Sequence, residues 1–293
     1  MPQFPLADQI RLACQMECSA KKPGNVHPEA DFNDVSYQDF MASADVIAPV
    51  LAQARETGVG GSIYDAVIKT RQMVGTNTNL GIILLLAPLA AIPAGKSCLD
   101  GIGPVLDSLT QVDAEFVYAA IRHAQPGGLG KVDEQDVASK PAIGLVEAMS
   151  LAADRDLIAR QYHNRFQEVL GFGCQSLLRS VNEEGMDWET AVISTQLQLM
   201  ATFPDTLIVR KCGSEIAVES QVRAQAVLNS NWRSDTDSHL EEFDRWLRND
   251  GHRRNPGTTA DLIAAILFVA LRDHQFAPAD VSLEMNCTRK PFV

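Results

Sequence analysis

Apolar residues recur every three or four positions through most of the chain, which is the spacing that one face of an α-helix requires. In residues 6–20 this face consists of Leu6, Ile10, Ala13, Cys14 and Cys18. The same pattern predicts helices over residues 37–55, 64–74, 116–124, 141–153, 158–170, 188–201 and 215–228. Alternating patterns typical of strands hardly occur, and the sequence therefore predicts an all-α fold.

Two segments are apolar on nearly every side, residues 80–92 and residues 259–272. A helix without a polar face has to be covered all round, so we expect both to be central helices of the core. The first is too short to cross a bilayer, which takes about 20 residues, and we expect no membrane anchor. Residues 207–209 form the only strand-like piece, and they are too few to found a sheet.

Composition narrows the class of protein. The chain has 293 residues, 46% of them hydrophobic, and no linker-like stretch, so we predict a single domain over residues 1–293. With a net charge of −12, the protein lacks the excess positive charge that binding to nucleic acid or to an anionic membrane requires. A polyphosphate ligand would need a local basic cluster, a divalent cation or helix N-termini. Six cysteines without a C-x-x-C pair, and no signal-peptide pattern, indicate a cytoplasmic protein.

Polar residues gather at four turns beside the predicted helices. The first turn, residues 21–27, contains Lys22, Gly24 and Asn25. Glycine allows close approach to the backbone and lysine can contact phosphate, so this turn is a candidate phosphate-binding loop. A helix C-terminus with dipole-compensating lysines and a Pro-Gly stop has the same composition, and the motif by itself leaves both interpretations open.

The second turn lies directly before the apolar segment 80–92 and consists of Gly75, Thr76, Asn77, Thr78 and Asn79. A helix N-terminus presents free N–H groups and a partial positive charge, which suit phosphate or a Mg²⁺-bound polyphosphate. Helix capping is the alternative, but it requires one such polar residue rather than four. The excess favours a ligand-binding turn.

The third turn contains Asp205 and Arg210, on either side of the strand-like piece at residues 207–209. The carboxylate there could hold Mg²⁺ or take a proton from a hydroxyl, and the guanidinium could bind phosphate. An ordinary ion pair is the alternative interpretation.

The fourth turn contains Gly257 and Asp261, which open the apolar segment 259–272. Asp261 is either a metal or ribose ligand or, with Thr258, part of a capping arrangement. We expect all four turns to meet in one cleft, because polar groups at buried helix ends make sense together only around a ligand.

These turns, in this order, resemble the triphosphoribosyl-dephospho-CoA synthase family of citrate- and malonate-lyase systems. The matching pieces are residues 22–24, 77–78 with Gly81, 205–210 with Gly213, and 255–257 with 260–262. The resemblance implies an all-α fold and a glycosyl transfer, in which ATP loses adenine and its triphosphoribosyl group passes to the 2′-hydroxyl of dephospho-CoA. A transfer of this kind has an oxocarbenium-like transition state.

On this resemblance we predict a Mg²⁺-dependent transferase that uses ATP. Asp205 is the first candidate for the catalytic base or metal ligand, and Asp261 is the second. The predicted nucleotide- and phosphate-binding residues are Lys22, Gly24, Asn25, Gly75, Thr76, Asn77, Thr78, Asn79, Arg210 and Gly257.

The chain departs from the family at Asn79 and Leu80, where the family has His and Lys. In this it is similar to homologues found beside tetrahydromethanopterin genes, so a related (phospho)ribosyl transfer to a pterin precursor is an alternative function. A non-catalytic helical protein that binds a nucleotide or pterin also stays open, as does a metal-dependent hydrolase of a ribosyl bond. The sequence leaves the oligomeric state undetermined.

Overall fold

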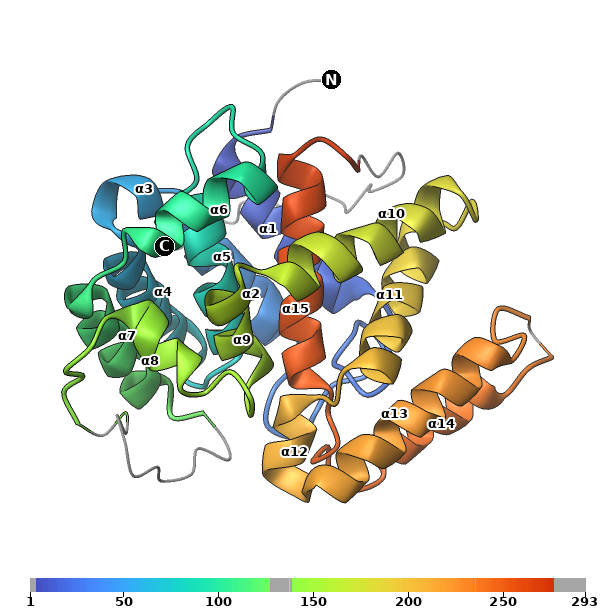
Figure 1. Cartoon of the computed structure of the whole chain (residues 1–293). Helices are drawn as coiled ribbons and strands as arrows, with labels where there is room; N and C mark the ends of the chain where they lie inside the picture. The colour runs from blue at the N-terminus through green and yellow to red at the C-terminus, as the bar shows by residue number, and fades with distance from the viewer. Residues whose placement is uncertain (1–3, 127–136, 138, 235, 277–293) are drawn as a thin grey trace, which may run out of the picture.

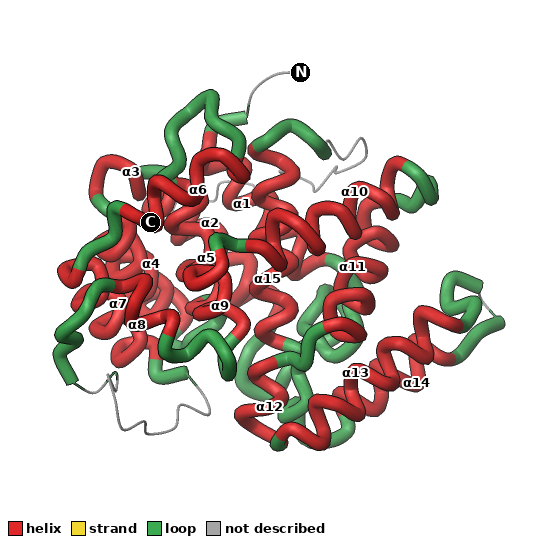
Figure 2. The backbone as a smooth tube through the Cα atoms, in the orientation of Figure 1, coloured by secondary structure: helices red, strands yellow, loops and turns green. Residues whose placement is uncertain are grey.

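The computed structural model describes residues 4–126, 137, 139–234 and 236–276. Within these residues the chain forms fifteen α-helices, one π-helix and no strand, which confirms the all-α prediction (Figures 1 and 2). The α-helices are α1 (Leu6–Ser19), α2 (Tyr37–Leu51), α3 (Ala54–Thr57), α4 (Val59–Val74), α5 (Leu80–Ala90), α6 (Cys98–Asp107), α7 (Gln111–Ala124), α8 (Leu145–Ser150), α9 (Leu157–Asn164), α10 (Cys174–Asn182), α11 (Trp188–Thr202), α12 (Thr206–Cys212), α13 (Ser214–Asn229), α14 (His239–Arg248) and α15 (Gly257–Arg272). The π-helix, η1, spans Gln167–Gly173.

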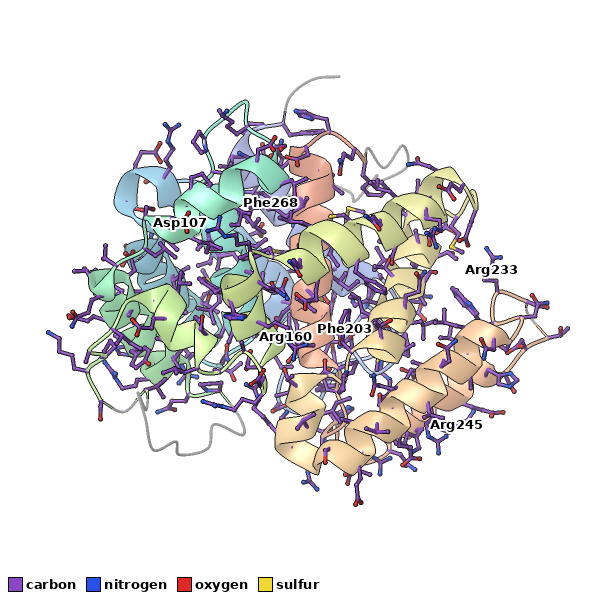
Figure 3. The ribbon with its side chains drawn as sticks, in the orientation of Figure 1. Asp107, Arg160, Phe203, Arg233, Arg245 and Phe268 are labelled. Carbon is purple, nitrogen blue, oxygen red and sulfur yellow. The ribbon has the colours of Figure 1, made fainter. Side chains whose placement is uncertain are left out.

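Helix α15 runs through the middle of the molecule, as its apolar sequence predicts (Figure 1). Every residue from Leu262 to Leu271 is buried, and Phe268 lies among the core side chains (Figure 3). Helix α5 is buried along almost its whole length and packs against α15. The two segments that lack a polar face are therefore the two central helices, because burial on all sides is the favourable environment for them.

Several helices begin at side chains that satisfy their free N–H groups. Ser36 with Asp39 forms a capping box at α2, and Thr110 with Asp113 forms one at α7. Such caps stabilise a helix by about 0.5–2 kcal/mol. They explain why α7 begins five residues before the predicted segment 116–124.

The predicted boundaries fail where apolar spacing continues across a break. Segment 37–55 ends at Leu51 and resumes as the short α3, and segment 141–153 is helical only over α8. Segment 158–170 is divided because Arg165 and Phe166 have positive φ angles, and the π-helix follows them. The pattern also failed to predict α6, α10 and α14.

The strand-like piece 207–209 is wrong as a strand. It lies inside α12, whose N-terminal N–H groups are capped by Asp205. Ile208 is fully buried in a second apolar cluster formed by α11, α12, α13 and α14. Capping and tertiary packing thus outweigh the β-propensity of a Leu-Ile-Val sequence.

The second cluster extends along α13 and α14, which lie side by side at one edge of the molecule (Figure 1). At its surface, the guanidinium groups of Arg223 and Arg254 stack on the ring of Trp246, with Cζ 4.7 and 4.5 Å from the ring centroid. These cation–π contacts stabilise the cluster. The single domain over residues 1–293 stays a prediction. No helix in the described part of the chain has the length and apolar character needed to cross a membrane.

Candidate active site

A cavity of about 760 Å³ lies where the four polar turns meet. Its lining includes Asn25 from the first turn, Arg210 from the third, and Gly257 and Asp261 from the fourth. All of residues 76–79 of the second turn line it as well. The predicted convergence of the turns is confirmed, because the helices α1, α4, α5, α12 and α15 begin or end around one space.

Four predicted site residues lie outside this lining, namely Lys22, Gly24, Gly75 and Asp205. Two of them are glycines that serve the backbone. Gly24 has φ +76°, and a Cβ there would come within 2.8 Å of Leu247 and Pro256. Gly75 ends α4 in the left-handed conformation that glycine tolerates best.

Lys22 is a buried cation rather than a free phosphate contact. Its side chain is 0% exposed, and Nζ lies 3.0 Å from Oε1 of Glu17. Nζ also donates a hydrogen bond to the backbone carbonyl of Glu17. The expected contact between Lys22 and phosphate is corrected, because a lysine enclosed with its counter-ion cannot reach a ligand.

Asp205 joins the N-termini of two helices. Oδ1 accepts hydrogen bonds from the backbone N–H groups of Leu207 and Ile208 at 2.9 and 3.0 Å. Oδ2 accepts from the N–H and the hydroxyl of Thr259 at 2.7 and 2.8 Å. Burial raises the pKa of this carboxyl, while the same hydrogen bonds oppose that rise. Both oxygens are therefore occupied by α12 and α15, and the geometry gives Asp205 a positioning role.

Asp261 is the carboxylate that faces the cavity. It has no hydrogen-bond partner among the described residues, and its Oδ2 lies so close to Gly81 that a Cβ there would be 2.0 Å away. Burial raises the pKa of Asp261 well above its usual range, and the negative charges of Glu17 and Asp205 raise it further, against Arg210. A carboxyl with free lone pairs and a raised pKa has the properties of a general base near neutral pH.

Glu17 is a second acidic residue of the cavity that the sequence pattern did not single out. It projects from α1 and is 4% exposed, with Lys22 as its counter-ion. The sequence signal that could have identified Glu17 was its position between Cys14 and Cys18 on an apolar helix face. A charged residue on a buried face requires a partner, and Lys22 supplies it.

Basic side chains line the wall formed by α12 and the segment before α9. Arg210 makes an ion pair with Asp156 at 2.8 Å, and Asp156 also caps α9. Arg155 and Lys211 line the same cavity, although neither belongs to the predicted site. This is the local basic cluster that a polyphosphate requires in a protein of net charge −12.

An aromatic pair forms another part of the lining. The rings of Phe32 and His252 lie 4.1 Å apart between centroids, tilted by 31°. His252 has φ +61°, which is uncommon for a residue other than glycine. Burial and the charge of Arg248 lower the pKa of His252, so the ring is neutral near pH 7.

The predicted metal ligands do not form a protein-built cage. Among the residues that the structure describes, no group of three or more His, Cys, Asp or Glu is placed to hold a metal ion. No described residue hydrogen-bonds the oxygens of Asp261, whereas those of Asp205 accept from backbone N–H groups and from the Thr259 hydroxyl. The arrangement fits a Mg²⁺ that arrives with nucleotide phosphates, since such an ion needs only one or two protein carboxylates.

The fold and this lining define a class: an all-α protein with a nucleotide-sized cleft built from helix termini. The sequence model of the ATP:dephospho-CoA triphosphoribosyl transferase family matches residues 4–279, and the chain belongs to this family. Membership confirms the predicted family and, with it, the prediction that the chain is a triphosphoribosyl transferase enzyme.

A solved structure supports the same assignment. The chain is similar to a candidate triphosphoribosyl-dephospho-CoA synthase from Archaeoglobus fulgidus, with 27% identity and a TM-score of 0.62. The similarity covers 80% of this chain and 98% of the archaeal one. No curated protein sequence matches the chain.

Proposed function

We propose that this chain transfers the triphosphoribosyl group of ATP to the 2′-hydroxyl of 3′-dephospho-CoA and releases adenine. The bond from C1′ of the ATP ribose to N9 of adenine breaks, and a bond from C1′ to the acceptor oxygen forms. The hydroxyl proton leaves to a base and adenine gains a proton, so the reaction is balanced. One observation carries the proposal: Asp261, a carboxylate that no described residue hydrogen-bonds, faces the cavity.

Asp261 is the base in this scheme. Its raised pKa makes the carboxylate a stronger proton acceptor than an ordinary aspartate, and the oxygen can take the 2′-hydroxyl proton as C1′ is attacked. Gly81 leaves the space that this side chain occupies. A negative carboxylate beside the ribose would also stabilise the positive charge that develops on C1′.

We assign the triphosphate to the basic wall, which is the part of the cavity formed by α12 and the segment before α9. Arg155, Arg210 and Lys211 offer guanidinium and ammonium donors there, and residues 76–79 offer N–H and hydroxyl groups at the start of α5. Mg²⁺ bound to the triphosphate would neutralise part of its charge, with Asp261 and Glu17 as the available carboxylates. We place the reaction in the cytoplasm, which supplies ATP.

The acceptor has a second candidate. Asn79 lines the cavity and is buried, with Leu80 beside it, where the family has His and Lys. The turn therefore lacks a cation, which favours a ligand with less negative charge at this point. A ribosylated pterin precursor is such a ligand.

The test is mass spectrometry of the products formed from ATP, or from phosphoribosyl pyrophosphate, with each acceptor in turn. We expect adenine from ATP only when dephospho-CoA is present, together with an acceptor heavier by one triphosphoribosyl group. Adenine released without any acceptor would indicate a hydrolase. No product in any combination would leave a binding protein. Turnover with the pterin precursor alone would move the reaction to the second acceptor.

A further inference from the structure

A chain of three amides leads from the core to the cavity. It begins at Gln196 of α11, which is fully buried. Its Nε2 donates to the backbone carbonyl of Pro23 at 3.1 Å and to Oδ1 of Asn25 at 2.8 Å. A backbone carbonyl can only accept, so the contact with Pro23 fixes which end of the Gln196 amide carries the donors.

That orientation determines the next two amides. Asn25 accepts from Gln196 through Oδ1, and its Nδ2 consequently faces Oδ1 of Asn255 at 2.8 Å. Asn255 therefore accepts at Oδ1 and keeps its Nδ2 group free. Asn255 lines the cavity, and its Nδ2 has no hydrogen-bond partner among the described residues. The chain thus delivers a donor of fixed direction to the ligand space.

Asn255 and the aromatic pair line the same cavity and belong to segments that are bonded to each other. The backbone N–H of Asn255 donates to the carbonyl of His252 at 3.2 Å, and the His252 ring packs on Phe32. Aromatic faces bind any base by stacking, whereas a single fixed N–H donor selects a base with an acceptor at one position. The neutral His252 ring adds no positive charge, which suits an uncharged heterocycle better than a phosphate.

We propose that Nδ2 of Asn255 donates a hydrogen bond to a ring nitrogen of adenine, and that Gln196 and Asn25 are positioning residues for this donor. The inference rests on the proposed function, in which both the donor and the acceptor substrate contain adenine. Asn255 then determines specificity for the base, while the basic wall binds phosphate.

Adenosine is the probe, because it has the base but no phosphate. In Asn255→Asp the side chain keeps an oxygen that accepts from Asn25, and it loses only the donor. We expect adenosine to bind this variant about tenfold more weakly by calorimetry, which corresponds to one hydrogen bond. Wild-type protein should also bind one of 1-, 3- or 7-deazaadenosine about tenfold more weakly than adenosine, and Asn255→Asp should not distinguish that analogue.

A second variant reverses the amide chain. In Asn25→Asp both side-chain oxygens accept, so Asn255 must turn its Nδ2 toward residue 25 and present a carbonyl to the cavity. We expect the same weakening of adenosine binding as in Asn255→Asp, although Asn255 itself is unchanged. Unaltered adenosine binding by both folded variants would overturn the proposal. Equal binding of all three deaza analogues by wild-type protein, or no adenosine binding, would overturn it as well.

Two further measurements separate this inference from the proposed function. The KM values for ATP and for dephospho-CoA in Asn255→Asp identify which substrate's adenine is bound, because only that KM should rise strongly. If Asn255→Asp turns over at the wild-type rate and its KM values are unchanged, the inference alone is rejected. If adenosine binding depends on the hydrogen-bond donor of Asn255 but the protein has no transferase activity, the proposed function alone is rejected.

Discussion

Asp205 and Asp261 lie near one another at the N-terminal end of α15, but their carboxylates differ in hydrogen bonding. Asp205 holds four hydrogen bonds from α12 and α15, and Asp261 holds none from the described residues. A carboxylate that is fully hydrogen-bonded stabilises the fold, whereas one that is desolvated and unpartnered is available for chemistry. Substitution by Asn separates the two roles.

Asp261→Asn should lower kcat by about 10²–10⁴-fold, because Asn cannot accept the proton from the acceptor hydroxyl. The same variant should be more stable than wild-type protein near neutral pH, since it removes a carboxylate whose ionisation is opposed by desolvation and by the charges of Glu17 and Asp205. Steady-state kinetics and thermal unfolding without ligand are the measurements. Near-wild-type turnover would move the role of base to Glu17.

Asp205→Asn is the matched control and should behave in the opposite way. The amide nitrogen would face N–H donors of α12 or α15, and we expect a loss of about 1–3 kcal/mol in the free energy of unfolding. Turnover per folded molecule should fall much less than in Asp261→Asn. A stable but inactive Asp205→Asn protein would restore Asp205 as the catalytic carboxylate.

The raised pKa of Asp261 has a consequence for pH dependence. A base works only when deprotonated, so kcat/KM should fall on the acid side at a pH above the ordinary aspartate value of about 4. Protonated Asp261 stabilises the fold below that ordinary value, and this contribution is lost as the pH rises through the folded pKa. Asp261→Asn should remove this loss of stability, which unfolding experiments across the pH range would detect.

At the scale of elements, the site depends on the crossing of α5 and α15. Gly81 in the first turn of α5 lies against Asp261, which follows the first turn of α15, and a Cβ at residue 81 would clash with the carboxylate. Helix α12 is held to the same place because Asp205 caps it and binds Thr259. Three helix N-termini are thus held around the proposed site without a metal cluster built by the described residues.

Gly81→Ala tests this crossing. The added Cβ would lie 2.0 Å from Oδ2 of Asp261, so the carboxylate has to move, and we expect kcat to fall at least about tenfold. Gly61→Ala in α4 is the control, because a Cβ there meets nothing within 4 Å and alanine favours a helix. Kinetics and circular dichroism of both variants check the prediction, and equal activities would show that Asp261 has no fixed catalytic position.

At the scale of the whole molecule, the cavity connects segments from both ends of the chain. Asn25 and Glu17 come from the N-terminal part, and Asp261 comes from the last described helix. A nucleotide bound there would contact α1, α5, α12 and α15 together. Binding to the folded state alone raises the stability of the whole assembly of helices.

We therefore expect ATP with Mg²⁺ to raise the midpoint of thermal unfolding. At a ligand concentration 100 times Kd the gain is about 2.7 kcal/mol, or several degrees for a chain of this size. Differential scanning fluorimetry with ATP, with Mg²⁺ alone and with both is the measurement. An effect of ATP that does not depend on Mg²⁺ would argue against the metal, and no effect of either would argue against the nucleotide site.

Hydrophobic spacing by itself determined the helical class and the central position of α5 and α15, because these depend on local periodicity and on burial. The polar residues between the helices identified the four turns. The roles within the site were decided by tertiary structure. The sequence predicted that Lys22 binds phosphate, but in the structure its ammonium group is paired with Glu17. The sequence predicted that Asp205 is a base, but its second oxygen accepts hydrogen bonds from Thr259. Partners from distant segments determine whether a polar group is free, and a linear pattern does not contain those contacts.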